Sequence, residues 1–199
     1  TVDGAGNVYI ADNTNLQKFS PDGKMLGFWP PPDGPSPDEL KGIDLSKPEN
    51  NELRLRAISR PSPNGLAFDI SGNIYVSESG GYQNELQIAR YGDNRYSRVR
   101  VLSSNGQELA RWIYAERSTT SSEIVVDAAG HVFVCDAMNN RVQVFNVKGN
   151  LLGAWGSRGT GNLEFNDPTD IAVDAAGKVY VADYVNNRVQ VFQIRDARK

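Results

Sequence analysis

The chain has 199 residues, and its 21 Lys and Arg against 24 Asp and Glu give a formal net charge of −3. The charges are mixed along the chain, which argues against a general nucleic-acid surface because such a surface needs clustered positive charge. A single cysteine excludes an internal disulfide, and a single histidine excludes a three-histidine zinc site within the chain. The sequence has no transmembrane run, and it leaves the cellular compartment open.

Four copies of one strand-rich pattern follow one another along the chain. They open on the aspartates Asp3, Asp69, Asp127 and Asp174, and the last two copies read almost identically at a constant offset. The first three copies each end on a glycine followed six residues later by a tryptophan: Gly23 and Trp29, Gly106 and Trp112, Gly149 and Trp155. Repeats with a period of about 40–50 residues are typical of β-propellers, in which each repeat forms one blade.

The internal pattern of a copy predicts a four-stranded antiparallel blade. In the last copy, Ile171–Val173 is a short apolar strand, and Asp174–Gly177 has the composition of a hairpin turn. Apolar and polar residues then alternate in two further strands, Val179–Ala182 and Arg188–Phe192. The fourth strand is represented by Leu151–Trp155 of the preceding copy. We therefore expect an all-β fold, a β-propeller. The aromatic residues that recur in the second strand are expected to pack between blades: Tyr9, Tyr75, Phe133 and Tyr180.

The segment Pro168–Phe192 closely resembles the NHL repeat, and Gly156–Phe165 is similar to that family's loop between blades. The resemblance implies a propeller, usually of six blades, but no single activity. The family includes protein-binding and RNA-binding domains, secreted bacterial proteins and an amidating lyase. We assign the whole chain, residues 1–199, to one propeller portion with copies at about 1–29, 63–112, 121–155 and 168–194.

Four copies fall short of six blades, and the sequence starts at Thr1 within a first strand. We therefore expect an arc that belongs to a larger propeller. The alternatives are a compact ring of four blades and two chains that complete a ring of eight. An open arc exposes strand edges, which predicts homo-oligomers formed through those edges.

Two inserts separate the copies, one at about 30–62 and one at about 79–96. The first is rich in proline and is therefore expected to be a loop. Long loops on a rigid scaffold commonly carry function, and tyrosine and arginine often anchor protein and peptide contacts. We predict that a protein, peptide or small ligand binds at the mouth of the central channel and at residues of the second insert: Tyr82, Arg90, Tyr91, Arg95 and Tyr96.

Arg98 and Arg100 follow the second insert, and with its arginines and tyrosines they form a local cluster. We expect this cluster to be a solvated loop and strand face. Binding of RNA by Arg90 and Arg95 is the third functional hypothesis, after the binding scaffold and a hydrolase.

Three polar residues, Asn64, Glu123 and Asp170, lie at the start of the first strand in successive copies. These positions border the channel of a propeller, and oxygen ligands from several blades suit Ca²⁺. The segment Pro63–Phe68 also resembles one in calcium-dependent lactonase and phosphotriesterase propellers, where the Asn binds the metal. The alternative function is thus a Ca²⁺-dependent hydrolase. The preferred expectation is a polar, water-filled channel lining without a cofactor.

The remaining reactive residues are expected to be structural, so no catalytic residue is predicted. His131 occupies a variable turn position, and Cys135 aligns with small side chains, which indicates a packed thiol. An acidic residue ends each second strand and is expected to bind the next turn and a nearby arginine: Asp12, Glu78, Asp136 and Asp183.

Overall fold

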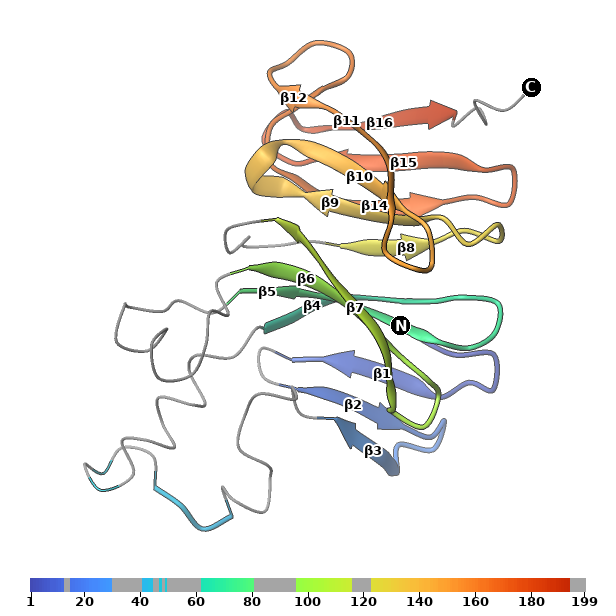
Figure 1. The fold of residues 1–199 in the computed structure, drawn as a ribbon, viewed down its shortest axis with the longest axis vertical. Coiled ribbons are helices and arrows are strands. Elements are labelled where there is room, and N and C mark those ends of the chain that lie inside the picture. Colours follow the sequence, from blue (N-terminus) through green and yellow to red (C-terminus); the bar gives the residue numbers. More distant parts are fainter. Residues whose placement is uncertain are drawn as a thin grey trace.

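The computed structural model describes residues 1–12, 15–29, 41–44, 47, 49, 62–80, 96–115 and 123–193. The described strands form four antiparallel sheets, blades 1 to 4, stacked one above the next in chain order (Figure 1). Blade 1 has β1 (Val8–Ala11), β2 (Leu16–Phe19) and β3 (Met25–Trp29). Blade 2 has β4 (Ser62–Phe68), β5 (Ile74–Ser79), β6 (Ser97–Leu102) and β7 (Glu108–Ala115). Blade 3 has β8 (Ile124–Val126), β9 (Val132–Asp136), β10 (Arg141–Phe145) and β11 (Leu151–Trp155). Blade 4 has β14 (Pro168–Val173), β15 (Lys178–Asp183) and β16 (Arg188–Gln193).

A parallel pair, β12 (Ser157–Arg158) with β13 (Glu164–Phe165), lies in the segment between blades 3 and 4. A short 3₁₀ helix, η2 (Ala137–Asn139), follows β9. The described ranges contain no α-helix, and none of their helices is long and apolar enough to cross a membrane. The predicted all-β fold with four-stranded antiparallel blades is confirmed.

The hairpin between the first and second strands of each blade follows the predicted chemistry. In blade 4, Asp174 Oδ1 accepts hydrogen bonds of 2.9 Å from the N–H groups of both Ala176 and Lys178. Gly177 completes the turn at a φ of +75°, a conformation that glycine adopts without steric cost. The second strands then run to the opposite side of the molecule, on the left in Figure 1, where β5, β9 and β15 end. We call that side the loop face and the hairpin side the turn face.

Successive blades bury one another's apolar faces. The valines of β9, Val132 and Val134, pack in a cluster with Tyr75 of blade 2, whereas Phe133 between them packs with Val179 of blade 4. Side chains that alternate along a strand point to opposite faces of its sheet, so each central strand contributes to two interfaces. The predicted packing between blades is confirmed for Tyr9, Tyr75 and Phe133, which are all buried.

The glycine–tryptophan spacing also has a structural cause. A Cβ at Gly149 would lie 2.6 Å from the ring of Trp112, and a Cβ at Gly106 would overlap the ring of Trp29. Trp29 and Trp112 therefore each pack on the glycine of the following blade, where only a residue without a side chain fits. Gly23, the equivalent glycine of blade 1, has nothing within 4 Å of such a Cβ.

Candidate functional site

A β-bulge determines how Asn64 is presented at the start of β4. Pro63 pairs with Glu78 and Leu66 with Val76, so two residues, Asn64 and Gly65, lie opposite one residue of β5. Bulges of this kind redirect a side chain and are frequent next to functional sites. The Asn64 amide donates a hydrogen bond to the Ser79 hydroxyl. A similar irregularity in β14 precedes Asp170.

Glu123 joins blades 2 and 3 immediately before β8. Its carbonyl oxygen accepts a hydrogen bond of 3.0 Å from the Cys135 N–H, and its half-buried carboxylate accepts hydrogen bonds from the N–H groups of Leu66 and Ile124. Burial raises the pKa of Glu123 above its usual 4.5, and the charge of Asp170 raises it further. The two hydrogen bonds and the charge of the N-terminal ammonium of Thr1, which also lines this region, lower that pKa only in part. A positively charged group beside Glu123 would relieve this penalty.

Asn64 and Glu123 line one cavity of about 370 Å³, whose remaining lining comes from Leu66, the first residue and β1. The cavity lies between blade 1 and the first strands of blades 2 and 3, so we call it the channel-side pocket. Its apolar wall includes Tyr9 and Ile10. An apolar wall with two convergent polar side chains is the usual composition of a ligand pocket.

The structure brings together two of the three predicted channel residues. Asp170 is exposed, its Oδ1 accepts a hydrogen bond of 2.7 Å from the Ile171 N–H, and it does not line the pocket. Within the described ranges, no group of three or more His, Cys, Asp or Glu residues could hold a metal ion. Because Ca²⁺ takes six to eight oxygen ligands, Asn64 and Glu123 would supply only part of a coordination shell.

Cys135 and His131 both have surroundings that indicate a structural role. Cys135 is fully buried, and burial raises the pKa of its thiol with further contributions from Asp170, Glu123 and Asp136. A thiol that stays protonated is a poor nucleophile. The Nδ1 atom of His131 lies 2.7 Å from Oδ2 of Asp127, the aspartate that opens its own hairpin. His131 thus belongs to the turn.

In blades 1, 3 and 4, the acidic residue that ends the second strand accepts hydrogen bonds from the turn that follows it. In blade 4, Asp183 accepts hydrogen bonds from Asn186, Gln190 and the Asn166 N–H, and it pairs with Arg188 at 2.7 Å. Its burial raises the pKa of Asp183, but these hydrogen bonds outweigh that effect and lower the pKa overall. Asp136 pairs with its own arginine at 2.8 Å, and Asp12 accepts a backbone hydrogen bond of 2.7 Å from its turn.

The expectation that Arg98 and Arg100 lie on a solvated face is wrong. Both are buried, and Glu78 pairs with Arg98 at 2.7 Å and with Arg100 at 2.8 Å. The signal was present in the alignment of the copies, because Arg98 aligns with Arg141, which pairs with the equivalent acid of blade 3. Buried arginines require such a partner.

Most of the predicted insert site lies outside the described residues. This applies to Tyr82, Arg90, Tyr91 and Arg95 and to most of both inserts. Tyr96 is described, is half-buried and directly precedes β6.

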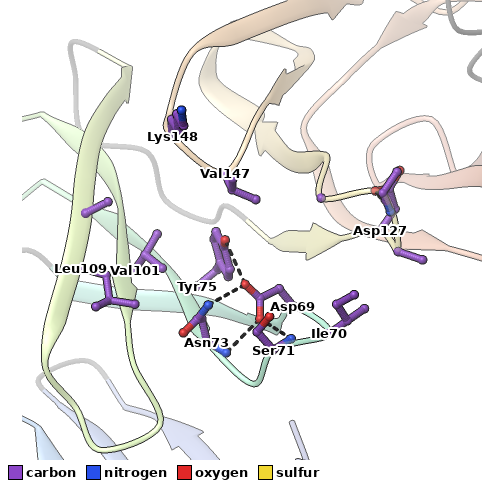
Figure 2. A pocket seen from close by; sticks show the side chains of 14 residues that line it. Asp69, Ile70, Ser71, Asn73, Tyr75, Val101, Leu109, Asp127, Val147 and Lys148 are labelled. Carbon is purple, nitrogen blue, oxygen red and sulfur yellow. Dashed lines mark hydrogen bonds between the residues drawn. The ribbon is translucent and has the colours of Figure 1, made fainter.

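A second cavity of about 640 Å³ lies on the turn face between blades 2 and 3 (Figure 2). Asp69 points into the group of labelled side chains, but its carboxylate is already occupied by the Ser71 N–H, by the N–H and amide of Asn73 and by the Tyr75 hydroxyl. Burial and the Asp69 charge raise the pKa of Tyr75 to about 12. These groups stabilise the hairpin, and none of the predicted site residues lines this cavity.

Comparison with known families agrees with the repeated geometry. The family model of the NHL repeat matches residues 165–192, which include β14 to β16. Blade 4 is an NHL repeat. Human NHL repeat-containing protein 3 is 36% identical over 101 residues, which cover 47% of this chain and 27% of the human protein. The NHL-repeat resemblance is thus confirmed.

Solved structures share the fold at low sequence identity. Streptogramin B lyase aligns with 99% of this chain and 54% of its own length, at 14% identity and a TM-score of 0.58. A putative gluconolactonase aligns with 98% of this chain and 62% of its own length, at 14% identity and a TM-score of 0.57. The chain therefore spans 54% and 62% of the lengths of these two structures.

Proposed function

We propose that this NHL-repeat chain is a binding module whose channel-side pocket receives a basic group of a protein or peptide partner. The observation that carries the proposal is the environment of Glu123, which is half-buried, faces the charge of Asp170 and shares a pocket with Asn64. A guanidinium or ammonium group would form a charge-assisted hydrogen bond with Glu123 and offset the repulsion from Asp170.

The difference between the recurring acids of the blades and the polar residues of the pocket supports the same proposal. The acids that recur at the ends of second strands are occupied by their own turns, as Asp136 and Asp183 illustrate. Asn64, in contrast, aligns with Ser122 and Thr169, and Glu123 aligns with Asp170, so the pocket combines an amide found in one copy with an acid found in two. The rigid blades would thus present these side chains to a partner, which requires no chemical step.

Isothermal titration calorimetry with the peptide Ac-Gly-Arg-Gly-NH₂ tests this function. We expect binding to the wild type that is weakened about tenfold or more in Glu123→Gln, because the charge on the acceptor is lost. Asp22→Asn, which removes an exposed carboxylate from a turn of blade 1, is the matched control and should bind as the wild type does. Equal affinities of the two variants would overturn the proposal.

A Ca²⁺-dependent hydrolase of the lactonase type is the second candidate. The observation in its favour is that Asn64 and Glu123 line the same pocket, as the resemblance of Pro63–Phe68 to a metal-binding segment requires. This candidate predicts that Ca²⁺ raises the melting temperature and supports hydrolysis of a sugar lactone, with both effects lost in Asn64→Ala. The binding module predicts no lactone hydrolysis at any Ca²⁺ concentration.

A further inference from the structure

The turn-face cavity of about 640 Å³ lies in the middle of the stack, between blades 2 and 3 (Figure 2). Its walls come from the β4–β5, β8–β9 and β10–β11 hairpins and from the first residues of β7. All of these segments are described, and neither chain end contributes to the lining. A cavity of this volume has room for side chains of a bound peptide.

Several residues at the mouth of this cavity depart from the repeat. Ile70 occupies a hairpin position where the other copies have a smaller residue: Gly4, Ala128 and Ala175. Val147 and Lys148 occupy hairpin positions where the earlier copies have Pro21 and Asp22 or Ser104 and Asn105. Residues that a blade needs for its own packing recur from copy to copy, so these three departures are not explained by the fold of one blade.

The apolar residues among them are exposed at one place. Ile70 is 84% exposed, Val147 is 44% exposed, and both line the cavity. Leu109 joins them at 52% exposed, because Val101 pairs with Ala110 and Leu102 with Glu108, which leaves Leu109 in a β-bulge. Single exposed apolar residues are ordinary, but a group of them around one cavity marks an interaction site.

The charged groups of the lining determine which ligand fits. The carboxylate of Asp127 is occupied by its own hairpin, since it accepts hydrogen bonds from the N–H groups of Ala129 and His131 and lies 2.7 Å from His131 Nδ1. Asp69 is occupied in the same way, as described above. Lys148 is exposed and forms no ion pair within the described ranges, and Figure 2 shows it across the cavity from Asp69. An acidic group is therefore favoured beside Lys148 and disfavoured near the two aspartates.

We propose that the turn-face cavity binds a segment of a partner protein that inserts an aliphatic side chain, such as leucine, and places an acidic side chain beside Lys148. A peptide fits better than a free aliphatic acid. A peptide backbone across the mouth covers Ile70, Leu109 and Val147 together, whereas a small acid inside the cavity leaves Ile70 exposed. This site is distinct from the channel-side pocket, and the inference does not depend on the function proposed there.

Titration of the ¹⁵N-labelled chain with the peptide Ac-Leu-Leu-Glu-NH₂ tests the proposal. We expect saturable shift changes at Ile70, Gly130 and Val147, with Leu66 and Ile124 of the channel side unchanged. Replacement of Glu by Gln should weaken binding about threefold, and replacement of both Leu by Ala about tenfold. Equal binding of the three peptides, shift changes centred on Leu66 and Ile124, or no binding at about 5 mM peptide would overturn the proposal. Hexanoate that binds as tightly as the peptide would overturn the assignment to a partner protein.

Variants of the protein locate the contact. Ile70→Ala restores the residue of blades 3 and 4, so it should keep the melting temperature and weaken the peptide about fivefold. The matched Ile113→Ala, at a 56% exposed isoleucine of the same blade outside the cavity, should bind as the wild type does. Equal affinities of these two variants would contradict the proposed site.

A second pair of variants tests the charge. Lys148→Gln should abolish the preference for the Glu peptide over the Gln peptide, because the cation beside the acid is lost. Lys24→Gln, at an exposed lysine in the equivalent hairpin of blade 1, should retain the full preference. A preference that survives in Lys148→Gln would overturn the role of Lys148.

Discussion

At the scale of single residues, position 100 is where blade 2 departs from its neighbours. Gln17, Gln143 and Gln190 donate hydrogen bonds to the acid of their own blades, and blade 2 has Arg100 at the equivalent position. Glu78 is thereby paired with two buried guanidinium groups instead of one. Burial of this charge makes the carboxylate of Glu78 essential, because removal of one partner leaves an uncompensated charge.

Glu78→Gln should therefore lower the stability of the protein much more than Arg100→Gln at the same site. We expect Glu78→Gln to lower the free energy of unfolding by about 3–5 kcal/mol, since two buried guanidinium groups lose their counterion. Arg100→Gln restores the residue of the other blades and keeps the Glu78–Arg98 pair, so its cost should be about 1 kcal/mol or less. Urea unfolding of both variants measures the difference, and similar losses would contradict this account of the pair.

The raised pKa of Glu123 has a consequence for stability. Between the usual pKa and the raised value, the folded protein binds more protons than the unfolded chain, so its stability decreases as the pH rises. Glu123→Gln removes the titration and should melt at a higher temperature than the wild type at pH 7. The advantage should vanish near pH 4, below the usual pKa, where both states of the wild type are largely protonated. Circular dichroism melts at the two pH values test this, and a lower melting temperature of the variant at pH 7 would count against it.

At the scale of elements, blades are joined by tryptophans that rest on glycines. Gly149→Ala should lower the free energy of unfolding by more than Gly23→Ala, because both residues have positive φ but only Gly149 lies against a tryptophan ring. We expect backbone strain to cost about 1 kcal/mol of unfolding free energy at either position. At Gly149 the overlap with Trp112 should cost a further loss of about 1–3 kcal/mol. If chemical denaturation gives equal losses of unfolding free energy for the two variants, the Trp112 ring moves aside at no energetic cost, which would contradict this prediction.

Sequence periodicity was sufficient for the strands because each blade satisfies the same local constraints. The alternation in Arg188–Phe192 predicts β16, and the turn Asp174–Gly177 predicts the hairpin between β14 and β15, each to within one residue of the observed strand ends. The side-chain contacts between blades could not be predicted in the same way. That Trp112 rests on Gly149 depends on contact between two blades, and the spacing within one copy gives no information on it.

The site was predictable only where it follows the repeat. The alignment of first strands placed Asn64 and Glu123 together at the channel, and they do line one pocket. It also placed Asp170 with them, but the pocket is lined by residues of blades 1 to 3, and Asp170 of blade 4 lies outside the lining. The Ca²⁺ site and the insert residues stay predictions, and the burial of Arg100 required knowledge of which face of β6 meets blade 1.

At the scale of the whole molecule, the described blades form a stack whose interior interfaces repeat and whose two ends do not. Val8 and Ile10 of β1 are partly exposed at one end, as Val189 and Val191 of β16 are at the other. Their counterparts in the middle of the stack, such as Val132, are fully buried between blades. The channel-side pocket, in contrast, lies along β1 and the first strands of blades 2 and 3.

The most direct test of the account is a map of all backbone amides during NMR titration with Ac-Gly-Arg-Gly-NH₂. The account predicts that the largest shift changes occur at Leu66 and Ile124, whose N–H groups bind the Glu123 carboxylate, and that Asn73 and Gly130 of the turn-face cavity do not move. Shift changes centred on Asn73 and Gly130, or none at Leu66 and Ile124, would contradict the assignment of ligand binding to the channel side.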